Sequence, residues 1–125
     1  MQAARHWRRR VFGLHTNSKV DLTSTAETVV YTSPAAGTST TATTSIIKSI
    51  LVSEDSGNAD SITLTLTDTS SNVFSLFKTK AISANATEEL LTHPLVITEG
   101  EVIKATAASG NRLHIVFSVL QITRD

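Results

Sequence analysis

The clearest pattern in the sequence is the strict alternation of "SITLTLTD" at residues 61–68. Ile62, Leu64 and Leu66 alternate with three threonines, and side chains two positions apart share one face of a β-strand. A helix would spread the same residues around its circumference. Threonine is β-branched and suits a half-exposed strand face. The segment therefore predicts a strand with an aliphatic face and a threonine face.

Similar runs recur along the chain, namely "ETVVYTS", "TTSIIKSILVS", "NVFSLFKTK", "EVIKATA" and "RLHIVFSVLQIT". In "NVFSLFKTK", alternation places Phe74 and Phe77 on opposite faces. The segments between the runs ("EDSGNAD", "DTSSN", "TEGE", "ASGN") are rich in Gly, Asn, Asp and Ser, which suit tight turns. Short strands separated by such turns predict an all-β fold, an antiparallel, jelly-roll-like β-sandwich of about eight strands.

The last run is apolar on both faces. Leu113, Ile115, Phe117 and Val119 alternate along one face, and Val116, Leu120 and Ile122 lie on the other. A sandwich needs only one apolar face per strand, so the second face requires a cover. Two covers remain open: the N-terminal segment of the same chain, or a neighbouring subunit. The candidate subunit-contact residues on this second face are His114, Val116, Leu120 and Ile122.

The N-terminus differs in composition from the rest of the chain. "RHWRRR" at residues 5–10 is followed by apolar residues that Gly13 interrupts, which predicts a basic, aromatic arm over residues 1–16 and a sandwich domain over 17–125. Residues 1–19 hold five basic residues and no acid, a net charge of +5, whereas the remainder holds six basic residues and eleven acids, a net charge of −5. This asymmetry is typical of an interaction tail.

The arm allows three interpretations. It could grip nucleic acid, with arginines on phosphates and Trp7 stacked on a base, although so few charges give a weak hold and the acidic body opposes it. It could be a disordered solubilising tail. It could anchor the protein to the acidic bodies of sister subunits, because Trp and Arg are enriched at binding hot spots. We favour the anchor, with docking residues Arg5, Trp7, Arg8, Arg9, Arg10, Val11, Phe12 and Leu14. This interpretation predicts that a chain without residues 1–16 folds but no longer joins its partner.

Residues that would carry chemistry are sparse. The chain has no cysteine, and its four histidines are not at metal-binding spacings. No G-x-S-x-G elbow or phosphate-binding glycine motif is present. Glu54, Asp55 and Asp60 could offer oxygen ligands to calcium, but their loop lacks the EF-hand pattern. We therefore expect no enzyme activity, small-molecule substrate, cofactor or metal. The apolar runs are also too short to cross a membrane.

Two longer segments carry a family resemblance. "TVVYTSPAAGTSTTATTSIIKSILVSEDSGNADSITLTLTD" and "LVITEGEVIKATAASGNRLHIVFSVLQI" resemble small β-sandwich virion proteins of tailed bacteriophages. Those proteins show a "vYt-P-G" turn, an "iikSilvsN" strand and an ending similar to "LvL-eGD-IkvtAs…lhv-vSvlei"; here Gly100 holds the turn and Glu101 replaces the usual Asp. The resemblance covers roughly residues 28–122 and excludes the arm. Its motifs are those of turns and strands, not of catalysis.

The resemblance implies a non-enzymatic structural protein of a tailed-phage virion. It would be made in the host cytoplasm and dock in many copies on the capsid or the head-to-tail region, as a decoration or cement protein. Its partners would be other virion proteins (capsid, portal, neck or tail) and copies of itself, with no membrane and no nucleic acid. An alternative within this class is a neck or tail component, such as an adaptor or a fibre- or spike-bearing part. From another class, a carbohydrate-binding or receptor-binding sandwich module remains open.

Overall fold

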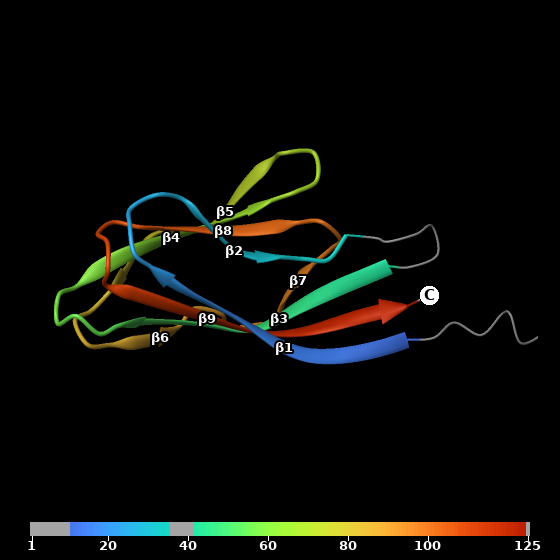
Figure 1. Ribbon diagram of the computed structural model, residues 1–125, viewed down its shortest axis with the longest axis horizontal. Coiled ribbons are helices and arrows are strands. Elements are labelled where there is room, and N and C mark those ends of the chain that lie inside the picture. Colours follow the sequence, from blue (N-terminus) through green and yellow to red (C-terminus); the bar gives the residue numbers. More distant parts are fainter. Residues whose placement is uncertain (1–10, 36–41, 125) are drawn as a thin grey trace, which may run out of the picture.

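A computed structural model describes residues 11–35 and 42–124, which form nine β-strands in two packed antiparallel sheets (Figure 1). The strands are β1 (Val11–Leu22), β2 (Thr28–Thr32), β3 (Ala42–Glu54), β4 (Asp60–Thr67), β5 (Val73–Ile82), β6 (Thr87–Glu89), β7 (Leu95–Ile97), β8 (Val102–Ala107) and β9 (Leu113–Arg124). Over these described ranges, no helix is long and apolar enough to cross a membrane. The predicted all-β sandwich is confirmed.

The strand order shows how the chain folds over itself. The first sheet has the order β1-β9-β3-β6, with β7 also paired to β3, and the second has the order β2-β8-β4-β5. The pairs β1·β9, β2·β8, β3·β6/β7 and β4·β5 are nested, as if one long antiparallel hairpin had been rolled up. This is the arrangement of a jelly roll. Nine strands occur instead of about eight because β6 and β7 are two short strands along the same edge of β3.

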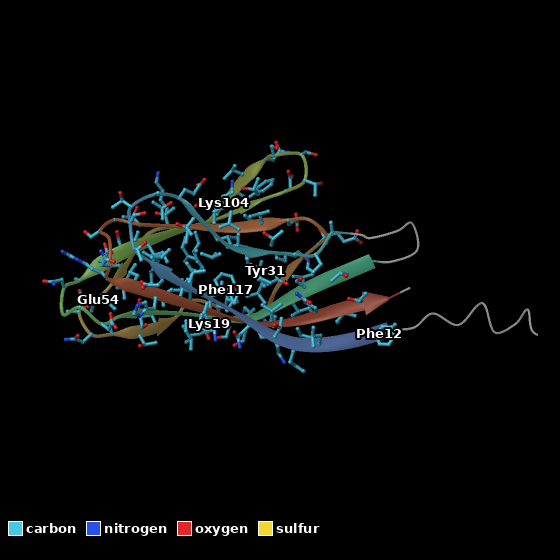
Figure 2. All side chains as sticks on the ribbon, viewed as in Figure 1. Phe12, Lys19, Tyr31, Glu54, Lys104 and Phe117 are labelled. Carbon is cyan, nitrogen blue, oxygen red and sulfur yellow. The ribbon has the colours of Figure 1, made fainter. Side chains whose placement is uncertain are left out.

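The core lies between the two sheets and is built from the alternating positions. Ile62 and Leu64 of β4 are fully buried, as their spacing predicts. Phe117 of β9 is also fully buried, and its ring stacks on Tyr31 of β2 with ring centroids 6.4 Å apart (Figure 2). Burial of such aliphatic and aromatic side chains contributes about 1.5–3 kcal/mol each, so this layer holds the two sheets together.

The predicted boundary between arm and sandwich is wrong, because residues 11–16 form the first half of β1. They pair with β9 in an unbroken register that begins with Val11 opposite Arg124. Gly13 does not interrupt this strand, because it keeps its place in the register opposite Ile122. A Cβ at this position would meet Leu120 Cδ1 at an ordinary 3.6 Å. Deleting residues 1–16 would therefore remove half a strand. Residues 1–10, with Arg5, Trp7, Arg8, Arg9 and Arg10, lie outside the described residues.

Bulges change which side chains share a face. The register between β4 and β5 shifts twice, so that Phe77 faces Leu64 and Phe74 faces Leu66. Leu64 and Leu66 lie on the same face of β4, and both phenylalanines therefore point to one side, contrary to the expectation from simple alternation. A further shift in β3 lies between Ile47 and Ser49. It makes Lys48 an extra residue opposite β9.

Candidate docking surface

The second apolar face of β9 lies on the outer side of the first sheet. The side chains of Leu113, Ile115, Phe117 and Val119 are buried in the core. Alternation turns the intervening residues to the other side, and His114, Val116, Leu120 and Ile122 are all partly exposed there. The structure thus brings the four predicted contact residues together on one surface.

Neighbouring strands extend this surface. Val96 of β7 and Ile46 of β3 are paired with each other, and Ile46 is paired with Leu120. Leu51 of β3 is paired with Val116 in the same way. Val96 is 56% exposed and Leu51 is 39% exposed. We call Ile46, Leu51, Val96, Val116, Leu120 and Ile122 the apolar outer face.

Sequence reasoning missed the contributions of β3 and β7 to this face. The run "TTSIIKSILVS" is apolar on both faces, which indicated that β3 also has outward apolar residues. Which residues those are depends on the bulge at Lys48, because the bulge changes the alternation between the two faces. The described part of the predicted arm does not cover the apolar outer face. Residues 11–16 lie beside β9 within the same sheet, not across its surface (Figure 1).

The predicted docking residues Val11, Phe12 and Leu14 are all exposed on β1, by 63%, 53% and 58%. Phe12 and Leu14 share the side of β1 that carries the buried Leu22, yet they stay exposed because this end of β1 runs past the second sheet (Figures 1 and 2). The apolar outer face therefore ends at a strand whose own apolar side chains are open to solvent.

A shallow hollow lies near the middle of the same outer surface, where the bulge lifts Lys48. It is lined by His15, Thr16, Asn17, Lys48, Ser118 and Val119. None of these is a Trp, Tyr or Phe, so the hollow lacks the exposed aromatic platform on which sugar rings usually stack. Five of its six lining residues are polar, so the hollow interrupts the apolar outer face next to β1.

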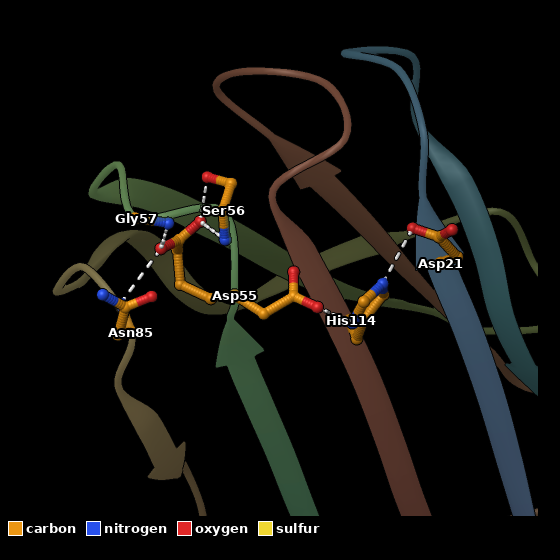
Figure 3. A network of polar contacts seen from close by, with 7 residues as sticks. Asp21, Asp55, Ser56, Gly57, Asn85 and His114 are labelled. Carbon is orange, nitrogen blue, oxygen red and sulfur yellow. Dashed lines mark hydrogen bonds and ion pairs between the residues drawn. The ribbon is translucent and has the colours of Figure 1, made fainter.

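At one end of the sandwich His114 lies beside exposed carboxylates (Figure 3). His114 lies between two carboxylates, with Nε2 3.3 Å from Asp21 Oδ1 and Nδ1 3.6 Å from Asp55 Oδ2. The side chains of Asp21 and Asp55 are 58% and 67% exposed. Glu27, in the turn after β1, is 56% exposed and 3.8 Å from Lys104. This end therefore presents several carboxylates to solvent.

Glu54 has a different role, because its side chain is only 2% exposed. Its carboxylate accepts hydrogen bonds from the backbone N–H groups of Ser56, Gly57 and Asn85 and from the Ser56 hydroxyl. Burial raises the pKa of Glu54, but these four hydrogen bonds outweigh it and lower the pKa to about 2. The carboxylate is occupied by the protein's own donors. Within residues 11–35 and 42–124, no group of three or more His, Asp or Glu side chains could hold a metal ion.

Comparison with known proteins identifies no family. No protein-family model matches the sequence, and no curated protein matches it either. Among solved structures, the chain is similar to the "Structure of infectious bursal disease virus Gx strain" (TM-score 0.46, 8% identity) and to that of the Gt strain (TM-score 0.46, 10% identity). The similarity covers 94% of this chain in both cases but only 32% and 33% of those chains. Similarity at this level carries no information about function.

Proposed function

We propose that this chain is a non-enzymatic structural protein of a virus particle, which docks in many copies on the capsid or the head-to-tail region of a tailed phage as a decoration or cement protein. The observation that carries the proposal is the apolar outer face, on a sheet whose inner face already forms the core. The resemblance of residues 28–68 and 95–122 to small sandwich virion proteins supports it independently.

The apolar outer face suits a contact that binds weakly as a single copy and tightly when many copies bind together. Each apolar side chain removed from water contributes about 25 cal/mol per Å². Only six side chains make up this face, and four of them are already half-buried, so one contact releases little surface. Symmetric repetition multiplies such a contact. A particle that presents many identical sites is the natural partner for it.

The proposal is tested on particles purified by density gradient from the source of the sequence. Mass spectrometry with a labelled standard peptide should find the chain in the particle band, in many copies per particle. A chain that stays with the free protein at the top of the gradient would exclude a virion role. Image averages of particles decorated with labelled chain distinguish the capsid lattice from the neck or tail, which is the alternative site.

A matched pair of variants tests the surface itself. Leu51→Glu with Val96→Glu places two charges on the apolar outer face at positions that are already exposed, so the fold should survive and particle binding should be lost. Val29→Glu with Val73→Glu is the control, because these residues are 52% and 63% exposed but lie on strands of the second sheet. Equal loss of binding in both variants would refute the assignment to the first sheet.

A further inference from the structure

β1 forms one edge of the first sheet. β9 pairs with all twelve residues of β1 without a register shift, and among the described residues no strand pairs with the other edge of β1. An edge strand presents unpaired N–H and C=O groups that invite another strand. Ser18 Oγ donates to the backbone oxygen of Val30 at 2.6 Å, which ties the second half of β1 to β2. The stretch of the edge that precedes this contact is residues 11–17.

This stretch lacks the usual features that prevent strand pairing. Residues 11–17 read "VFGLHTN", with no proline, lysine or acid. The register against β9 shows no bulge. Natural edge strands are commonly blocked by charge, proline or a bulge. Here three side chains on the edge, Val11, Phe12 and Leu14, are instead apolar and more than half exposed.

Charge is distributed unequally along the axis of β1. Four arginines lie within the ten residues that precede Val11, and no acid occurs before Asp21. At the other end of the strand, Asp21, Asp55 and Glu27 are all more than half exposed. Four arginines thus precede one end of β1 in the sequence, and three exposed carboxylates lie at the opposite end, where Lys104 contacts Glu27 at 3.8 Å.

We propose that the open edge of β1 pairs antiparallel with β1 of a second copy of this chain. In that arrangement the Val11 end of each copy, which four arginines precede in the sequence, lies toward the Asp21 end of the other copy, and two-fold symmetry repeats this attraction. A parallel pair would instead set arginine beside arginine and carboxylate beside carboxylate, which is unfavourable. Charge complementarity therefore selects both the partner and its direction.

The dimer has a consequence for the docking surface. Two antiparallel neighbouring strands are related by a two-fold axis perpendicular to their sheet, so equivalent faces lie on the same side. The two first sheets would join into one continuous sheet, with both apolar outer faces on one surface. The inference thus deepens the proposed function but does not rest on it, because dimer formation is measured on the purified chain without any particle.

The first test is the mass of the full chain in solution, by light scattering or sedimentation over a range of concentrations. The wild type should form a dimer. Phe12→Lys with Leu14→Lys places charges on the edge at exposed positions and should raise the dimer dissociation constant by about tenfold or more. Val29→Lys with Val73→Lys, equally exposed elsewhere, should leave it unchanged. A wild type that stays monomeric at every concentration would overturn the proposal.

The second test reads the direction of pairing. The chain has no cysteine, so single cysteines at positions 13–17 give clean cross-links. In a two-fold antiparallel pair a residue faces its own copy only at the axis, where the Cα separation of about 4.5–5.5 Å permits a disulfide. Cross-linking should therefore peak at one position and fall on both sides. Uniform cross-linking at every position would indicate a parallel pair and contradict the proposal.

The third test addresses the charges. Arg8→Glu, Arg9→Glu and Arg10→Glu together should weaken the dimer at low salt, and the difference from the wild type should shrink as salt rises. Asp21→Lys with Asp55→Lys in the other copy should restore pairing with the Arg-to-Glu chain. If the Arg-to-Glu chain dimerises with unchanged affinity but loses DNA binding, the arm serves nucleic acid and the charge argument is wrong.

Discussion

The carboxylate of Glu54 accepts a hydrogen bond of 3.0 Å from the backbone N–H of Asn85, 31 positions further along the chain. The backbones of the same two segments are also hydrogen-bonded, because the N–H of Glu54 donates to the Ala86 carbonyl oxygen at 2.9 Å. Asn85 has a φ of 57°, in the left-handed region. Glu54 thus joins the end of β3 to the turn before β6, and it does so as a buried anion.

Replacing Glu54 by glutamine should lower the thermal midpoint of unfolding at neutral pH. The amide offers one acceptor oxygen in place of two, and its NH2 group would face the donors of Ser56, Gly57 and Asn85. Glu27→Gln is the control, since its exposed carboxylate faces only Lys104 at 3.8 Å. Circular dichroism melts of both variants decide the matter, and equal melting temperatures would contradict a role for the buried anion.

The same carboxylate predicts a pH dependence. The folded protein holds the pKa of Glu54 at about 2, below its ordinary value of 4.5. Because the folded-state pKa is depressed, the stabilisation is complete above pH 4.5 and is lost as pH falls toward 2. Urea titrations across this window should show a steeper loss of stability for wild type than for Glu54→Gln. Parallel curves would mean that other carboxylates account for the acid sensitivity.

Two glycines should differ in how much stability an alanine substitution removes. At Gly110 a Cβ would lie 2.6 Å from the backbone oxygen of Thr23, so the turn before β9 must move. We expect Gly110→Ala to cost about 1–3 kcal/mol. At Gly13 the nearest contact would be Leu120 Cδ1 at 3.6 Å, and the cost should stay within about 0.5 kcal/mol. Denaturant unfolding compares the two, and similar losses would show that close approach is not the cause.

The hydroxyl of Tyr31 belongs to a buried hydrogen-bond network and should contribute to the stability of the fold. Its hydroxyl oxygen lies 2.8 Å from Ser45 Oγ and accepts a hydrogen bond of 2.8 Å from Gln121 Nε2. Ser45 is fully buried and is also hydrogen-bonded to Ser33. Tyr31→Phe should therefore cost about 1–2 kcal/mol. A double-mutant cycle with Ser45→Ala should show coupling, whereas strict additivity would place the two hydroxyls in separate roles.

The bulge in β3 predicts an unusual tolerance of deletion. Without Lys48, Ser49 would follow Ile47, and both would keep the register they already have against β9. The deletion variant should fold with a melting temperature close to wild type. Deleting Leu51 instead forces one half of β3 to exchange its inner and outer faces, and it should abolish cooperative unfolding. The reverse order of tolerance would mean that the bulge is required for pairing.

The local alternation of apolar and polar residues was enough to predict the strands and the sandwich. A strand with one buried face repeats its apolar residues at every second position. Ile62, Leu64 and the alternating residues of β9 lie where that period places them. Pairing could not be predicted in the same way. The bulge at Lys48 and the shared side of Phe74 and Phe77 depend on partners distant in sequence, which no local period encodes.

The candidate site shows the same limit. The surplus apolar residues of β9 were visible as an unexplained second face, whereas Ile46 and Val96 join them only through pairing with β3. The start of β1 was misplaced because Gly13 weakens a strand taken alone. In the folded protein Gly13 lies opposite Ile122 of β9, and the strand continues to Val11.

The position of β9 between β1 and β3 has a consequence for synthesis. The ribosome makes β1 and β3 long before β9. Among the described residues β1 has no other partner strand in the first sheet, and β3 otherwise pairs only with the short strands β6 and β7. Until residues 113–124 emerge, two long strands have no common partner, and their apolar sides must be kept from other nascent chains. Completion of the first sheet is therefore a late event, and a chain cut short before β9 would leave β1 unpaired and β3 paired only on the side of β6 and β7.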